Sequence, residues 1–163
     1  MPCETLLEYL KVSGIPFELK EHPHAFAARE VAAKAGVPGH QFAKSVLVKL
    51  DGEMAMAVIP AAHKLNFNVL REVAGAGTIA LALEHEFASR FPDCELGAMP
   101  PFGNLYDLRV IVDDHLDEAE TITFNAGTHT EAITMAFGDF VELVQPEMAR
   151  FTFQPLLEFR GEA

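Results

Sequence analysis

The spacing of hydrophobic residues predicts a helix near the start of the chain. Leu6, Leu7 and Leu10 recur at helical spacing within residues 4–13. Gly14 follows directly, and glycine commonly ends a helix because it adopts left-handed backbone geometry. Residues 15–20 then predict a short strand. The alanine-rich residues 27–35 predict a second helix, with Gly36 just beyond its end.

Two apolar runs on either side of Asp51-Gly52 predict a β-hairpin. The runs cover residues 42–50 and 53–59, and Asp-Gly between two such runs favours a two-residue turn. Residues 54–59 are apolar at every position. We therefore expect the second strand to be central in its sheet and covered on both faces.

The hydrophobic pattern over the rest of the chain predicts three more helices and three more strands. It predicts helices over residues 66–74, 84–91 and 138–144, and strands over residues 108–112, 121–126 and 131–137. Strands and helices do not alternate strictly, which favours an α+β fold with a mixed sheet flanked by helices. Because the chain shows no linker and no repeat, we expect one domain over residues 1–163.

Composition and charge argue against several classes of function. The 163 residues are 50% hydrophobic and 22% charged, which is typical of a globular protein. The net charge of −12 argues against DNA or long duplex RNA as a partner, although a local basic patch could still hold the tip of an RNA. We expect no membrane span and no signal peptide, and with two cysteines we expect a cytoplasmic location.

A proline-rich segment predicts a rigid loop. Each proline fixes its own backbone and lacks an N–H, while the bracketing glycines permit sharp entry and exit. Backbone groups that no strand uses would be available to hold a small polar group. The alternative is a stiff connector without a ligand. The segment is Gly97, Ala98, Met99, Pro100, Pro101, Phe102 and Gly103.

Lys44 is the strongest single-residue candidate for a functional side chain. It shares a strand face with Val46 and Val48, and the two-residue turn places it opposite Ile59. An ammonium at the end of an apolar face needs a partner or a pocket mouth, unless it extends into solvent. Ser45 points to the other face, so the two do not form a nucleophile pair.

Other polar residues give weaker signals. Residues 125–130 (Asn-Ala-Gly-Thr-His-Thr) join two predicted strands and offer an amide, hydroxyls and an imidazole, although tight turns often have this composition. Neither His22-Pro23-His24 nor Asp113-Asp114-His115 has spacing that selects a metal, so we interpret both as surface loops. No phosphate-binding glycine motif is present, and we expect no cofactor and no metal.

Five segments together resemble one family, the YbaK/EbsC proteins, which also occur as the editing insertion of bacterial prolyl-tRNA synthetases. The resemblance covers roughly residues 20–145. The segments are residues 32–37 (AAKAGV), 42–48 (FAKSVLV), 58–60 (VIP), 97–103 (a Gly-x-x-x-Pro loop continued by Phe-Gly) and 124–127 (FNAG).

This resemblance implies a partly barrel-like mixed sheet and hydrolysis of mischarged aminoacyl-tRNA in trans. It implies catalytic roles for Lys44 and Gly97, and substrate binding by the rest of the loop (Ala98, Met99, Pro100, Pro101, Phe102, Gly103) together with Asn125, Gly127 and His129. The implied partner is the 3′ aminoacyl-adenosine end of tRNA, delivered by a synthetase or an elongation factor.

Several points remain open at the level of sequence. The family often continues Val-x-x-Pro-Gly, whereas here Pro60 is followed by Ala61-Ala62-His63-Lys64, a stretch that would either face the RNA end or form a surface turn. The amino acid removed could be alanine or cysteine, carried by tRNA-Pro. The competing functions are a non-catalytic module that binds aminoacyl-tRNA ends or a protein, and a small-molecule or metal-assisted esterase.

Overall fold

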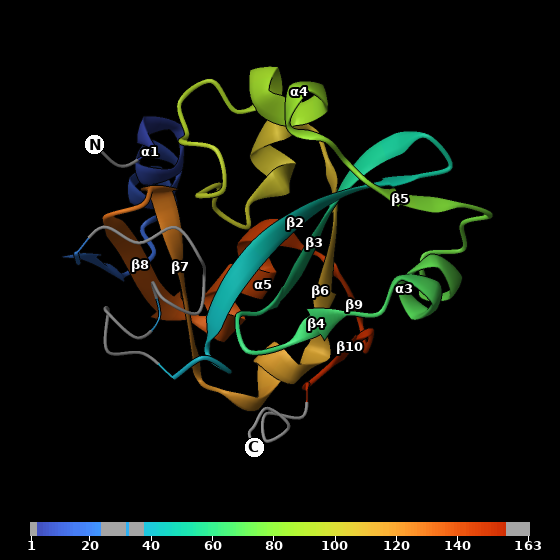
Figure 1. Cartoon of the computed structure of the whole chain (residues 1–163). Helices are drawn as coiled ribbons and strands as arrows, with labels where there is room; N and C mark the ends of the chain where they lie inside the picture. The colour runs from blue at the N-terminus through green and yellow to red at the C-terminus, as the bar shows by residue number, and fades with distance from the viewer. Residues whose placement is uncertain (1–2, 24–31, 33–37, 156–163) are drawn as a thin grey trace.

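The computed structural model describes residues 3–23, 32 and 38–155, and its main feature is a curled, half-barrel mixed sheet (Figure 1). The strand order is β1-β8-β7-β2-β3-β6-β9, and β5 also pairs with β2. Their bounds are β1 Phe17–Glu21, β2 Phe42–Leu50, β3 Glu53–Pro60, β5 Ile79–Leu81, β6 Arg109–Asp113, β7 Thr121–Thr128, β8 Glu131–Ala136 and β9 Glu147–Ala149. A separate pair joins β4 (Lys64–Leu65) to β10 (Thr152–Phe153).

Helices cover both faces of this sheet. The α-helices are α1 (Glu4–Ser13), α3 (Phe67–Val73), α4 (Glu84–Phe87) and α5 (Phe137–Val144), and the 3₁₀ turns are η1 (Ala88–Arg90), η2 (Gly103–Tyr106) and η3 (Asp114–Glu118). Helices α1 and α5 contribute buried side chains such as Leu6 and Phe140 to the larger core. Helix α3 packs Leu70 into a second core on the opposite face. Among the described residues, no helix has the length and apolar character needed to cross a bilayer.

The α+β fold with a partly barrel-like sheet is confirmed, and so is the central hairpin. Strand β2 pairs with β3 so that Lys44 lies opposite Ile59, as the two-residue turn predicts. Asp51 and Gly52 both have positive φ, which is the backbone geometry that this turn requires. Strand β3 lies between β2 and β6, and all of its residues from Ala55 onward are buried.

Other predictions need correction. The helix expected over residues 84–91 breaks into α4 and η1, and the strand expected over residues 121–126 continues to Thr128. Gly127 lies at a β-bulge within that strand rather than at the turn. The helix predicted over residues 27–35 falls, apart from buried Ala32, outside the described residues. Strands β4, β5, β9 and β10 were not predicted, because two or three residues show no periodicity.

One edge of β2 pairs with two different strands, β7 and β5. At its start, β2 pairs with β7 in parallel through Phe42 and Ala43. At its end, it pairs with β5 in antiparallel through Val48 to Leu50. The stretch between these two contacts holds Lys44 and Ser45. β7 and β5 therefore contact opposite ends of this edge of β2. We call the stretch of β2 between these two contacts the fork.

The start of the chain is tied to this region by Cys3. Its N–H donates to the Ala126 carbonyl at 2.6 Å, and its thiol donates to Asp93 at 3.0 Å. Tyr106 donates to the other Asp93 oxygen at 3.1 Å. Burial by itself would raise the pKa of Asp93, but hydrogen bonds from Cys3, Thr5 and Tyr106 outweigh it and lower the pKa to about 2.

We expect Gly127→Ala to destabilise the fold by about 2–4 kcal/mol, because two costs combine. Gly127 has φ +100°, and an added Cβ would lie 2.7 Å from Cys3 Cβ and 2.9 Å from Cys3 N. Urea unfolding measures the change. Gly138→Ala is the matched control, since its Cβ would meet nothing within 4 Å and the position is helical. Equal stabilities of the two variants would contradict this packing.

We expect Asp93→Asn to lower the free energy of unfolding by about 1 kcal/mol at pH 6, because the ionised carboxylate accepts the stronger hydrogen bonds. The folded pKa lies below the unfolded value of 3.8, so this contribution is present above pH 4 and disappears as the pH falls toward 2. Urea unfolding at several pH values measures the difference, with Asp117→Asn as the control for loss of one negative charge. A difference that does not change with pH would contradict the assignment.

Candidate active site

The Gly-x-x-x-Pro loop is attached to strand β7 by backbone hydrogen bonds. The Glu95 N–H donates to the Gly127 carbonyl at 2.7 Å, and the Gly127 N–H donates to the Ala98 carbonyl at 3.0 Å. Between these bonds the chain turns sharply at Gly97, which has φ +86°. The expectation that no strand uses the loop carbonyls is therefore wrong for Ala98. The two bonds hold Gly97 beside the bulge of β7.

His129, which is itself buried, lies next to this turn. An ideal Cβ built on Gly97 would lie 3.4 Å from His129 Nε2. The other ring nitrogen, Nδ1, is 2.8 Å from Glu95 Oε1, and the His129 backbone N–H donates to the same oxygen at 2.9 Å. An ionised carboxylate only accepts hydrogen bonds, so Nδ1 donates to Glu95 and Nε2 is the ring nitrogen that lies toward Gly97.

A cavity of about 380 Å³ opens beside the same glycine, at the fork between β7 and β5. Its volume lies within the range of small-molecule sites. The Ser45 Oγ is buried and has no hydrogen-bond partner among the described residues. The cavity is lined by Ser45, Val46, Leu47, Leu81, Ala82, Leu83, Glu84, Phe87, Gly97 and Met99. The sequence did not single out Ser45 as a site residue, and three consecutive residues of β2, Ser45 to Leu47, line this cavity.

Lys44 and Asn125 lie on the other face of the sheet. Lys44 alternates with Ala43 and so shares a face with Phe42, which packs with Ala132 in a small buried cluster. Asn125 lies directly opposite Ala132 and therefore shares this face. Lys44 is absent from the residues that line the cavity beside Gly97. Its side chain is half-buried, next to the point where β2 and β7 separate.

The rest of the loop is buried against the core. Phe102 is completely buried and packs edge-on against Phe140, with Phe124 at 5.6 Å between ring centroids. A Cβ on Gly103 would lie 2.8 Å from Val110, so a side chain does not fit there. These contacts fix the inner side of the loop, while Gly97 remains exposed. The buried residues are Ala98, Met99, Pro100, Pro101, Phe102 and Gly103.

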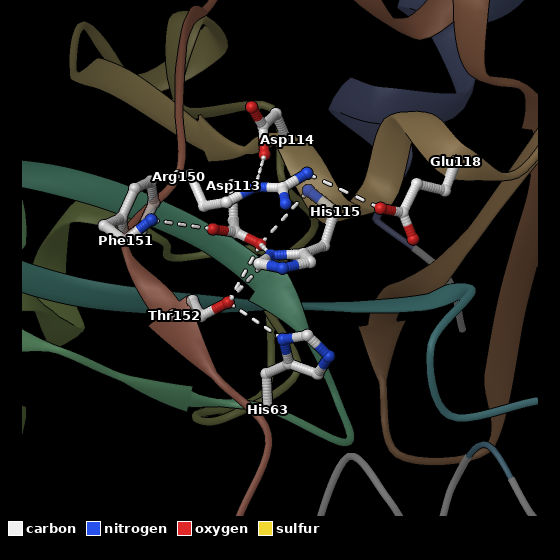
Figure 2. Close-up of polar contacts among 8 residues, drawn as sticks. All are labelled: His63, Asp113, Asp114, His115, Glu118, Arg150, Phe151 and Thr152. Carbon is white, nitrogen blue, oxygen red and sulfur yellow. Dashed lines mark hydrogen bonds and ion pairs between the residues drawn. The ribbon is translucent and has the colours of Figure 1, made fainter.

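Two groups of described side chains combine residue types that can bind metals. One is Cys3, Asp93 and Cys94, and the other is His63, Asp113 and His115. The interpretation of Asp113-Asp114-His115 as a surface loop is wrong for Asp113, which is completely buried. Figure 2 shows the hydrogen bonds that it accepts from Phe151 and Thr152. Burial lowers the pKa of His63, and neighbouring His115 lowers it further.

The structure tests only some of the predictions for the other histidines. His22 is buried, contrary to the surface-loop interpretation, because β1 ends immediately before it and its N–H donates to the Thr130 carbonyl. His24 lies outside the described residues. Of the two residues after Ala62, His63 is buried and Lys64 is exposed. The alternative of a simple surface turn therefore fails for His63.

Comparisons with known proteins agree with this architecture. A solved structure described as a "putative trans-editing enzyme for prolyl tRNA synthetase" superposes with a TM-score of 0.81 at 17% identity, and the match covers 93% of this chain and 96% of the other. At this identity the likeness shows the fold.

Sequence relatives are proline–tRNA ligases. The ligase of Staphylococcus saprophyticus is 28% identical over 145 residues, which cover 81% of this chain and 25% of the ligase. The ligase of Bacillus mycoides is 29% identical over 91 residues, which cover 56% of this chain and 16% of the ligase. The chain thus spans a quarter or less of these relatives. Residues 22–143 match the family described as "Aminoacyl-tRNA editing domain". The chain therefore belongs to the aminoacyl-tRNA editing domain family.

Proposed function

We propose that this chain is a trans-acting deacylase that hydrolyses the ester between a wrong amino acid and the terminal adenosine of tRNA. Residues 1–163 would act as a single editing domain. The observation that carries the proposal is the exposed Gly97 backbone, held against His129 at the mouth of a 380 Å³ cavity. Gly97 has positive φ and no side chain, so a ligand can approach its Cα closely, while its N–H lies 3.3 Å from the Met99 sulfur.

The chemistry requires one water and stabilisation of two developing charges. Water attacks the ester carbonyl, and the ribose oxygen leaves as an alkoxide that must gain a proton. His129, oriented by Glu95, presents Nε2 to accept a hydrogen bond from that water or from the substrate α-ammonium. Loop amides or the Lys44 ammonium stabilise the negative charge. The neighbouring ribose hydroxyl supplies a further proton donor.

Because the aminoacyl ester is already reactive, the protein needs to supply less catalytic acceleration. An aminoacyl ester hydrolyses readily, so holding water and carbonyl in line supplies much of the acceleration. This agrees with a site built from backbone and one imidazole. The cavity would take part of the aminoacyl-adenosine, with the buried Ser45 hydroxyl as a polar contact in an otherwise mainly apolar lining.

We infer that the amino acid removed is small. A synthetase pocket discriminates poorly against a substrate smaller than the correct one, which creates the need for a second hydrolytic site. The proline–tRNA ligase relatives support tRNA-Pro as the carrier and alanine or cysteine as the wrong amino acid. With a net charge of −12, the chain would depend on a synthetase or elongation factor for delivery, in the cytoplasm.

For a substrate that extends from the Gly97 cavity to the opposite face of β2, Lys44 supplies a cation to the developing negative charge, so Lys44→Ala should lower the deacylation rate about 100-fold with the fold intact. The assay follows release of alanine and of cysteine from mischarged tRNA-Pro. Lys11→Ala, at an exposed lysine of helix α1, is the control and should keep the wild-type rate. Unchanged turnover in the Lys44 variant would remove that residue from the mechanism. Wild-type protein that binds the substrate without releasing the amino acid would instead identify a non-catalytic binding module.

Gly97→Ala should lower the same rate at least 10-fold, because its Cβ would lie in the space between the turn and His129 Nε2. Gly75→Ala is the matched control. Gly75 has φ +73°, similar to the +86° of Gly97, but its Cβ would meet nothing within 4 Å. Both variants carry the cost of an alanine in left-handed backbone geometry, about 1–2 kcal/mol. They differ in whether the added Cβ lies beside His129. Equal deacylation rates would contradict the site.

A further inference from the structure

Four polar side chains from distant parts of the chain meet near the ends of β3 and β6. His63 follows β3, Asp113 is the last residue of β6, His115 lies in η3, and Thr152 begins β10. Figure 2 shows them converging on the Thr152 hydroxyl. Asp113 is fully buried, and His63 is 8% exposed. None of these residues takes part in the proposed deacylation.

The donor atoms lie at separations close to those of a metal coordination shell. Thr152 Oγ1 is 2.9 Å from His63 Nδ1, 2.9 Å from Asp113 Oδ2 and 3.3 Å from His115 Nδ1. Asp113 Oδ2 and His115 Nδ1 are 2.6 Å apart. Tetrahedral zinc with bonds of 2.0–2.1 Å places its ligand atoms about 3.3 Å apart. To accept an ion, the Asp113–His115 pair at 2.6 Å must therefore widen by about 0.7 Å and the two pairs at 2.9 Å by about 0.4 Å.

Charge also favours a divalent cation at this position. Among the residues drawn in Figure 2, Asp113, Asp114 and Glu118 are anionic and Arg150 is cationic, which leaves two negative charges in excess. Arg150 pairs with Asp114 at 2.7 Å and with Glu118 at 3.5 Å. The other Asp113 oxygen accepts the Phe151 N–H at 2.9 Å, which orients the carboxylate.

We propose that His63, Asp113 and His115 bind a divalent transition-metal ion of the zinc class, with the Thr152 hydroxyl closing the fourth position. Two imidazole nitrogens and a carboxylate oxygen form a borderline donor set, which suits zinc better than calcium or magnesium. Because a protein group lies at the fourth position, the site is closed, as structural zinc sites are. Its role is to fasten β10 to the ends of β3 and β6.

The test is zinc binding by the untagged full-length chain after treatment with a chelator. Isothermal titration with Zn²⁺ should show binding at this site, and a 100-fold excess over Kd should raise Tm by about 5–10 °C. Tetrahedral Co²⁺ gives visible bands, and the ligand set here predicts them without a sulfur-to-metal charge-transfer band in the near ultraviolet. His63→Ala and His115→Ala should each weaken binding at least 10-fold.

Two controls separate this site from other ligands. His85→Ala changes an exposed histidine and should bind zinc as the wild type does. Cys94→Ser disables the second candidate group, Cys3, Asp93 and Cys94, and should leave the Tm increase intact. The proposal is overturned if wild-type protein shows no Tm increase with Zn²⁺, which would identify the group as a hydrogen-bond network only. It is equally overturned if His63→Ala and His115→Ala bind as the wild type does.

Discussion

The geometry of the candidate active site depends on two backbone hydrogen bonds that join residues 95–98 to Gly127. They convert a proline-stiffened loop into an extra partner for β7 and fix Gly97 beside His129. This docking requires glycine at position 127, because Cys3 packs so closely that a Cβ would overlap it. The chain start, the bulge in β7 and the loop therefore form one unit, and a change in any of them should move the others.

The sheet supplies the space for this unit. Strand β2 pairs with β7 at its start and with β5 at its end, so the stretch between them opens onto the cavity beside Gly97. Alternation along β2 then separates two kinds of side chain. Ser45 lines the cavity, while Lys44 and Asn125 share the other face of the sheet. In the proposed reaction, a substrate that reaches both residues must lie across the fork.

Local patterns predicted much of this structure and long-range contacts account for the rest. The Asp51-Gly52 turn set the register of the hairpin and placed Lys44 opposite Ile59, because both depend on neighbouring residues. The prolines and Gly97 predicted a rigid, sharp turn. The Glu95–His129 pair and the cavity position of Ser45 join segments dozens of residues apart, and no local spacing encodes them. The same holds for His63, whose partners are His115 and Thr152.

The most direct test of the active-site account is amide chemical-shift mapping with a non-hydrolysable alanyl-adenosine, in which an amide replaces the ester. The account predicts that the largest shifts occur at Gly97, Ala98, Gly127 and His129, while Gly75 and Gly138 stay unchanged. Binding that leaves Gly97 and His129 unshifted, with the perturbations confined to another face, would contradict the account.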